Sequence, residues 1–328
     1  MASAIAEDLT SSDELQFPFV PVALDTLAPS AELPFDLFLR TDASRPPILY
    51  RERRLTVRKE DLSSLMGQAI ETLYIRASEH VAYRNYLRSA VLSNADLPAT
   101  RRFKILQIAN RAVLQQAFQN PRPDMVVDIT REYGRELATI VCNDDLVLTD
   151  LLPLMTHDYQ TYTHATNVCT LALMIAAVMG MEFADGIVEM AAAMLLHDIG
   201  KRKIPSATLN QRLPLTPEQR DTFRQHPKWG FQELCRRQDI TLEQLMVVYH
   251  HHEQWNGHGY PVGLVGEETH LWARICAVAD AYDTLASSRP NQPARGQKEI
   301  WEILESGSGH RFDGNLVKCL KSAVGPLN

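Results

Sequence analysis

The segment AAAMLLHDIGK, residues 191–201, decides how the C-terminal half of the chain folds. With the residues before it, this segment places apolar side chains at helical spacing, at Ile187, Met190, Ala191, Met194 and Leu195. The pair His197-Asp198 ends this predicted helix, and Ile199-Gly200-Lys201 follows at once. An earlier run shows the same i, i+3, i+4 pattern, at Val168, Leu171, Ala172, Ile175 and Val178. From residue 151 onward the pattern predicts an all-helical bundle with its main loops at 200–217 and 256–266.

Histidines and aspartates gather along these predicted helices. His164 lies near the start of the earlier helix, His226 opens a His-Pro turn, and residues 250–253, His-His-His-Glu, close a third apolar helix. Asp280 lies inside the apolar run 275–282. A carboxylate in so apolar a helix costs several kcal/mol unless it is paired or binds a metal. Taken alone, Asp280 would more often be a buried cap or an ion-pair partner than a metal ligand, and a single helical histidine is usually an ordinary core or surface residue.

Taken together, these side chains indicate a metal site. Imidazoles and carboxylates suit a divalent transition metal such as iron, manganese or zinc. Several ligands at helix ends that face one cavity could hold two ions, with one carboxylate bridging them. Such a site activates a bridging hydroxide and clamps the attacking and leaving oxygens of a phosphoryl group, which is the chemistry of phosphodiester hydrolysis.

The N-terminal half has a different pattern. Short strand-like runs, at 19–22, 35–39, 48–50, 55–57 and 73–75, surround one helix predicted from Glu60 to about Thr72. We therefore expect a small α+β domain at residues 1–95, linking helices at 96–150 with a break at 120–123, and the helical domain at 151–328. The fold class predicted for the whole chain is mainly α. The N-terminal domain shows no ligand spacing, so a structural or dimerisation module is favoured over a specific sensor.

Composition excludes several classes of protein. The net charge of −7 argues against a binder of polymeric nucleic acid, although a small dianionic ligand needs only a local positive site. No run approaches the roughly 20 apolar residues of a membrane span, and the N-terminus lacks the order of a signal peptide. Five scattered cysteines without a CxxC pair are typical of reduced, structural thiols. We expect a cytoplasmic protein.

Five segments of the C-terminal half resemble the HD-GYP family, a branch of the HD-domain metallophosphohydrolases. They are YTHATNV at 162–168, HDIGK at 197–201, HHEQWNGHGYP at 251–261, ARI at 273–275 with VAD at 278–280, and SRP at 288–290. The resemblance covers about residues 150–322, and its motifs are highly specific. It implies an all-α domain that hydrolyses cyclic di-GMP to pGpG or GMP with two divalent ions, most often iron or manganese.

The resemblance also implies roles for individual residues. The family's metal ligands fall on His164, His197, Asp198, His226, His251, His252 and Asp280. Asp198 would bridge the two ions and, with Lys201, would be catalytic, since the family lysine contacts the scissile phosphate. Arg289 matches an arginine that grips a substrate phosphate, although a helix C-terminal cap is an equal alternative. The loop residues Gly259, Tyr260 and Pro261 lie near the substrate in the family and are proposed to contact diguanylate cyclase domains.

Three positions depart from the family pattern. Gln160 replaces a glutamate that supports a third metal in some members, so two ions are expected. Gln292 replaces a lysine and removes one positive charge from the substrate site, while Asn256 replaces an aspartate in a tight turn. Alignment to the His-His-Glu motif selects His251 and His252 as ligands and leaves His250 spare.

Three functions therefore compete. The first is an active cyclic di-GMP phosphodiesterase. The second is a catalytically weak cyclic di-GMP receptor, or a docking module for diguanylate cyclase domains, which the two glutamines keep open. The third is a phosphohydrolase of a hybrid cyclic GMP-AMP, which differs only in base recognition. A homodimer is compatible with each.

Overall fold

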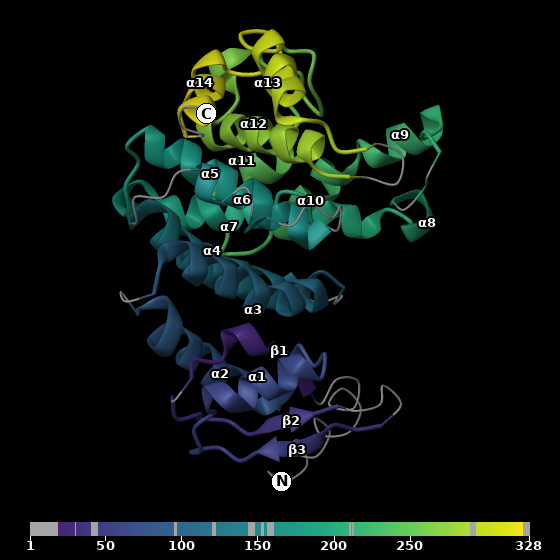
Figure 1. Cartoon of the computed structure of the whole chain (residues 1–328). Coiled ribbons are helices and arrows are strands. Elements are labelled where there is room, and N and C mark those ends of the chain that lie inside the picture. Colours follow the sequence, from purple (N-terminus) through teal and green to yellow (C-terminus); the bar gives the residue numbers. More distant parts are fainter. Residues whose placement is uncertain are drawn as a thin grey trace, which may run out of the picture. The chain divides into compact units, whose positions relative to one another are not determined.

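The computed structural model describes residues 19–29, 31–40, 45–94, 97–119, 123–143, 148–151, 154–155, 161–209, 211, 213–288 and 293–323. Contacts between residues divide the chain into two compact units, Met1–Ala112 and Val113–Asn328 (Figure 1). The division falls within a long helix, α3 (Ala99–Gln119). The three-part arrangement expected from the sequence, with linking helices at 96–150, stays a prediction.

The first unit is built on a four-stranded antiparallel sheet. Its strands are β1 (Phe19–Ala23), β2 (Leu37–Leu39), β3 (Ile48–Arg51) and β4 (Thr72–Arg76), in the order β1-β4-β2-β3. The helices are α1 (Lys59–Gly67) and α2 (His80–Leu87), and a π-helical turn (Arg88–Leu92) follows α2. Apolar side chains from the sheet and from both helices form the core of this unit, including Leu37, Leu65, Leu73, Ile75 and Tyr83.

Most of the predicted strands of this unit are confirmed, but two expectations were wrong. Residues 55–57 form no strand, because only Thr56 pairs across to Glu32 through an isolated bridge. The helix predicted to reach Thr72 ends at Gly67, and Ala69 then adopts a left-handed φ of 58° before β4 begins.

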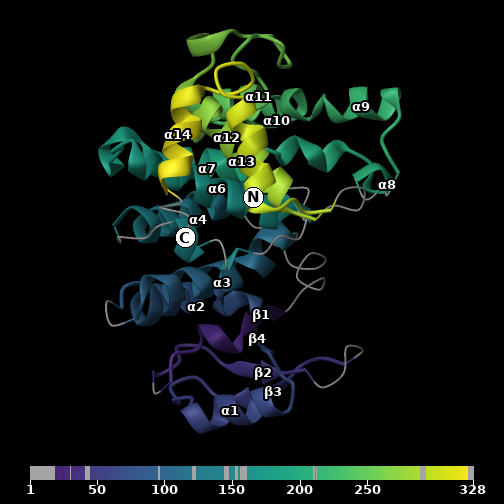
Figure 2. The same cartoon turned by 45° about the horizontal axis from the view of Figure 1, so that its top comes forward.

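The second unit is helical throughout its described residues, apart from isolated bridges and loops (Figures 1 and 2). Its longer helices are α4 (Pro123–Asn143), α6 (Thr161–Val178), α7 (Ile187–Leu196), α10 (His226–Leu234), α11 (Leu242–His250), α12 (Leu271–Ala286), α13 (Gln297–Ser306) and α14 (Gly314–Ala323). Its short helices are α5 (Leu148–Leu151), α8 (Ser206–Leu209), α9 (Pro217–Phe223) and the 3-10 segments η5 (Phe183–Asp185), η6 (Ile199–Lys203) and η7 (Gly266–Glu268). The mainly α fold class is confirmed.

The centre of this unit is α7, which packs against α4, α6 and α11. Every residue of α7 except Val188 and Glu189 is buried, as expected for a helix that is apolar on all sides. Gly134 allows α4 to approach closely, since a Cβ there would lie 3.0 Å from the backbone nitrogen of Ala192. The apolar run of α6 ends sooner than its spacing indicates, because Val178 is 44% exposed.

Among the described residues, we found no helix with the length and apolarity needed to cross a lipid bilayer.

Candidate metal centre

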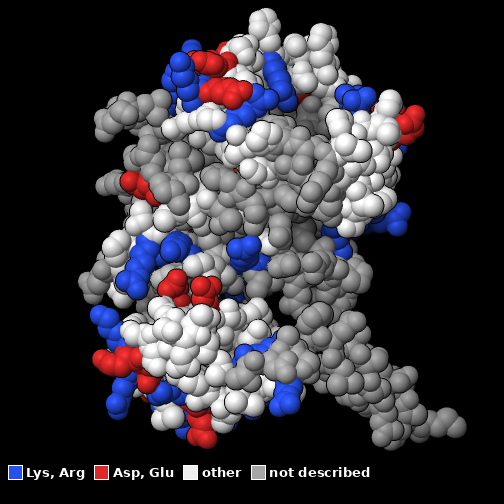
Figure 3. Space-filling model, turned by 45° about the vertical axis from the view of Figure 1, so that its right-hand side comes forward, with Lys and Arg blue, Asp and Glu red and all other residues white. Residues whose placement is uncertain are grey.

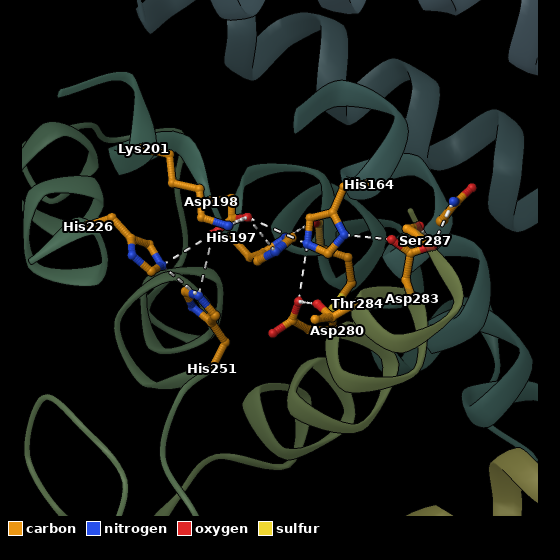
Figure 4. Close-up of polar contacts among 12 residues, drawn as sticks. His164, His197, Asp198, Lys201, His226, His251, Asp280, Asp283, Thr284 and Ser287 are labelled. Carbon is orange, nitrogen blue, oxygen red and sulfur yellow. Dashed lines mark hydrogen bonds and ion pairs between the residues drawn. The ribbon is translucent and has the colours of Figure 1, made fainter. Parts of the chain in front are cut away.

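Six elements of the second unit bring the predicted ligands together. His164 lies on the first turn of α6, and His197 and Asp198 join the end of α7 to η6. The His-Pro sequence predicted a turn at His226, but His226 is the first residue of α10. The remaining ligands are His251 and His252, just after α11, and Asp280 within α12. Figure 4 shows the side chains from these elements converging on one small volume.

Asp198 lies at the centre of this arrangement, and each of its oxygens faces a different set of side chains. Asp198 Oδ1 lies 3.2 Å from His226 Nε2 and 3.7 Å from His251 Nε2. Asp198 Oδ2 lies 3.3 Å from His197 Nε2 and 3.5 Å from His164 Nε2, and it accepts a hydrogen bond from Lys201 Nζ. A carboxylate placed in this way can bridge two ions.

Two groups of ligand atoms result. One group consists of Asp198, His226, His251 and His252, which we call the His251 cluster. The other consists of His164, His197 and Asp280, which we call the Asp280 cluster. Within each group the ligand atoms all lie within 4.8 Å of one another. In the His251 cluster, the Nε2 atoms of His251 and His252 each lie 3.2 Å from His226 Nε2.

Hydrogen bonds behind the imidazoles determine which nitrogen faces inward. The Nδ1 atoms of His197, His226 and His251 lie 2.6–3.1 Å from backbone carbonyl oxygens three or four residues earlier. A carbonyl only accepts, so Nδ1 donates in each case and Nε2 is the ring nitrogen that faces Asp198. This support behind the ring is typical of metal-binding histidines.

His164 is supported by a carboxylate instead. Its Nδ1 lies 2.7 Å from Asp283 Oδ2, while Asp283 Oδ1 accepts hydrogen bonds from Asn167 Nδ2 at 2.7 Å and Ser287 Oγ at 3.3 Å. Asp283 is only 1% exposed. Sequence reasoning missed Asp283, although the cost of a carboxylate in the apolar helix applies to it as much as to Asp280, which lies one turn earlier.

The donor set fits a cation. Within the part of the chain that the structure describes, three buried polar atoms, His164 Nε2, His197 Nε2 and Asp198 Oδ1, have no hydrogen-bond partner. Inward lone pairs on imidazoles and carboxylates would repel one another unless a proton or a metal ion lies between them. Imidazole and carboxylate ligands together are those of divalent transition metals. This chain therefore has a cluster of histidines and aspartates able to bind metal.

The protonation states of most of these side chains also suit metal binding. Burial acts to raise the pKa of Asp198, but Lys201 and His197 hold that pKa well below its usual range. Burial and the neighbouring histidines lower the pKa of His251 far below its ordinary value, and burial together with His226 lowers the pKa of His252 to about 3. At neutral pH the carboxylate is charged and these imidazoles are neutral, which are the forms that bind metal.

Lys201 reaches the centre because η6 packs tightly against α10. Gly200 makes this approach possible, since a Cβ there would lie only 2.0 Å from the carbonyl oxygen of His226. The Lys201 ammonium lies 5.2 Å from the centre of the Phe223 ring and donates to Asp198. The close approach of Gly200 to His226 therefore positions both the His226 imidazole and the Lys201 ammonium at the predicted phosphate site.

The loop that contains Gly259, Tyr260 and Pro261 borders the His251 cluster. The Tyr260 ring stacks on His252, with 4.8 Å between ring centres and 26° between planes, and the Arg224 guanidinium lies 5.3 Å from the Tyr260 ring centre. Gly259 leaves no room for a side chain, because a Cβ would meet the backbone of residues 253–254 at 2.3–2.4 Å. Pro261, the next residue, is exposed.

Glu253 anchors the same loop and was given no role from the sequence. Its carboxylate is buried and accepts hydrogen bonds from the backbone N–H groups of Val262, Gly263 and Leu264 at 2.7–3.2 Å. The Glu of the His-His-Glu motif thus holds the loop that follows Tyr260 against the turn after α11 that carries His251 and His252.

The remaining predicted positions have different outcomes. Among the described residues, His250 belongs to neither cluster, and its assignment as the spare histidine stays a prediction. Asn256 Oδ1 accepts from the His258 N–H at 3.0 Å, as in a tight turn. Arg289, Gln160 and Gln292 lie outside the described residues.

Helical packing and a cluster of histidines and aspartates able to bind metal are the features of a helical domain of the HD type. In agreement, the model of the HD domain family matches residues 147–316. A cyclic di-GMP phosphodiesterase of Pseudomonas aeruginosa is 31% identical over 284 residues, 81% of this chain and 67% of that protein. A cyclic di-GMP phosphodiesterase of Thermotoga maritima is 36% identical over 162 residues, 49% of this chain and 44% of that protein.

A solved structure has the same fold along nearly the whole chain. The HDG"Y"P protein Bd1817 of Bdellovibrio bacteriovorus superposes with a TM-score of 0.66 at 19% identity, covering 94% of this chain and all of the other. The chain belongs to the HD domain family and to its HD-GYP branch. It spans about two thirds of the length of the Pseudomonas relative and less than half of the Thermotoga one.

Proposed function

We propose that this chain is a phosphodiesterase that hydrolyses cyclic di-GMP to pGpG, GMP or both, with two divalent ions, iron or manganese. One observation carries the proposal: the two oxygens of Asp198 face two separate sets of ligand atoms, His226 and His251 on one side and His164 and His197 on the other. The names of the two phosphodiesterase relatives support cyclic di-GMP as the substrate.

The side chains of the centre have distinct tasks. When bound, two divalent ions supply Lewis acidity to a phosphoryl oxygen and make water a strong nucleophile at neutral pH. Asp198 fixes the two proposed ion positions relative to each other, because its side chain is 1% exposed and is contacted from both sides. Lys201 offers a positive charge at the edge of the centre, where it stabilises negative charge that develops on the phosphate. Arg289 is proposed as a second contact to phosphate.

The Tyr260 ring borders the proposed substrate site. Its ring is partly exposed and is fixed by stacking on His252, and Arg224 lies beside it. A rigid aromatic ring next to a cation suits a flat nucleobase joined to a phosphate. The charges on the described part of the face in Figure 3 are of both signs, so a locally positive site is a better match to a small anion than to a polymeric nucleic acid.

The test is hydrolysis of cyclic di-GMP by protein purified anaerobically and reconstituted with iron(II) or manganese(II), with products separated by chromatography. We expect pGpG or GMP from the wild type and none from Asp198→Ala, which should also lose metal. Lys201→Ala should slow turnover while metal content stays intact. Full activity of Asp198→Ala would refute the metal assignment, and equal loss of metal and turnover in Lys201→Ala would make Lys201 structural.

Failure of the metal-loaded wild type to turn over bound cyclic di-GMP would favour the receptor or docking function instead. Contacts with diguanylate cyclase domains, a homodimer and a cytoplasmic location stay predictions from the sequence. Assays with a hybrid cyclic GMP-AMP as competing substrate would determine base selectivity.

A further inference from the structure

The two clusters differ in what lies behind their histidines. Behind His197, His226 and His251 the hydrogen-bond acceptor of Nδ1 is a neutral backbone carbonyl. Behind His164 it is the carboxylate of Asp283, at 2.7 Å. A carboxylate behind a ligand imidazole makes the inward nitrogen a stronger electron donor and fixes the orientation of the ring.

Asp283 is itself held rigidly. Asn167 and Ser287 donate to its Oδ1. Its Oδ2 faces His164, as Figure 4 shows. The side chain is 1% exposed, so water does not screen its charge. The contact between Asp283 and His164 is therefore a fixed feature of the buried core between α6 and α12.

Fixed negative charge is also distributed unequally between the clusters. Asp198 is shared, because each cluster faces one of its oxygens. The Asp280 cluster has in addition the carboxylate of Asp280, 3.1 Å from His164 Nε2, and the carboxylate of Asp283 behind the same ring. The other ligands of the His251 cluster are three imidazoles. The Lys201 ammonium on Asp198 Oδ2 offsets one of these charges, but the two additional carboxylates still leave the Asp280 cluster the more negative side, which attracts a divalent ion more strongly.

We propose that Asp283 is a positioning residue that makes the two ion positions unequal, so that the Asp280 cluster binds a divalent ion more tightly and fills first. The proposal rests on the proposed function to the extent that both clusters bind an ion. It adds an order of loading and assigns that order to a side chain that contacts no ion itself.

The test is a titration of metal-free protein with manganese(II), in which electron paramagnetic resonance measures the free ion. The wild type should bind two ions in two steps of different affinity. In Asp283→Asn, which keeps the size of the side chain but removes its charge, the tighter step should weaken by about 10–100-fold. The weaker step should stay within about twofold of its wild-type value.

Single-cluster backgrounds identify the step that changes. In His251→Ala the ion that remains belongs to the Asp280 cluster, and adding Asp283→Asn should weaken it by the same factor. In His164→Ala the remaining ion belongs to the His251 cluster, and adding Asp283→Asn should leave it unchanged. Equal weakening in both backgrounds, or in neither, would overturn the proposal.

Ser287→Ala provides a milder second variant if Asp283→Asn does not fold, as judged by circular dichroism. It removes one 3.3 Å hydrogen bond to Asp283 and no charge, so a smaller weakening of the tighter step alone is expected. No change in that step would count against the proposal. A wild type that binds one ion or none would instead refute the two-ion site of the proposed function, which separates the two failures.

Discussion

The sharpest test of how this site is supported is the replacement of Glu253, which belongs to neither of the two clusters found among the described residues. Its buried carboxylate accepts from three backbone N–H groups, those of Val262, Gly263 and Leu264. These residues follow Tyr260, whose ring stacks on His252. Loss of the carboxylate should therefore release the loop and loosen the wall of the site.

The cost follows from the number of hydrogen bonds. A hydrogen bond to a charged group contributes about 1.5–3 kcal/mol, and a neutral one about 1 kcal/mol. Val262 is 55% exposed, so water can replace part of what its N–H loses. We therefore expect Glu253→Ala to lower the free energy of unfolding by about 2–4 kcal/mol, in total for three donors. Glu253→Gln should lower the free energy of unfolding by about half as much. Its amide oxygen can still accept a hydrogen bond, but its NH₂ group faces a backbone N–H and cannot accept from it.

The assay is urea unfolding of the full chain, with the melting temperature as a second measure. A loss of 3 kcal/mol corresponds to a fall of about 6–12 °C for a unit of this size. Glu268→Ala is the matched control, since Glu268 is exposed and accepts from a single backbone N–H, that of Val265, at 2.8 Å. It should lose less than about 1 kcal/mol. Equal losses in Glu253→Ala and Glu268→Ala would refute the anchoring role.

Two further predictions concern the loop and the ligands. Gly259→Ala should destabilise the protein by more than Glu253→Gln does in the same urea assay, because its Cβ would lie 2.3 Å from the backbone nitrogen of Gln254; unchanged stability would contradict the packing. Burial acts to lower the pKa of His164, but Asp280 and Asp283 outweigh it and raise that pKa to about 9. Below pH 9 a bound ion must therefore displace this proton from His164. Calorimetry in buffers of different ionisation enthalpy should show that manganese binding releases about one proton per protein at pH 7.5, and that manganese affinity rises with pH. Binding without net proton release would contradict this prediction.

The seven side chains of the two clusters could be picked out from the sequence because each lies in a motif or interrupts an apolar helix, and metal binding by them stays a prediction. It did not predict Asp283, since the distinction between a ligand and the carboxylate behind a ligand depends on how α12 is rotated toward α6, and that rotation is set by packing. The role of Glu253 was missed for a similar reason. Its partners are backbone N–H groups, and these leave no trace in residue type.

In the N-terminal unit the error at residues 55–57 has another cause. Strand-forming residues become a strand only where a partner strand runs alongside, and here Glu32 supplies a single bridge. Helix α2 was missed although Tyr83, Tyr86 and Leu87 are buried at helical spacing. That signal was present in the sequence, but the short length of the helix made it weak.

The fixed charges of the centre predict that metal loading controls substrate binding as well as chemistry. Without ions, three carboxylates, Asp198, Asp280 and Asp283, outnumber Lys201 and a protonated His164, so the site repels a dianion. Two divalent ions with a neutral His164 reverse this to two net positive charges, equal to the two phosphate charges of a cyclic dinucleotide. A tenfold change in the affinity for the dinucleotide requires only about 1.4 kcal/mol of binding free energy, which is well within the attraction between opposite charges near a protein surface. We therefore expect a non-hydrolysable phosphorothioate analogue of cyclic di-GMP to bind manganese-loaded protein at least tenfold more tightly than metal-free protein. Equal affinities would mean that the dinucleotide binds away from this centre.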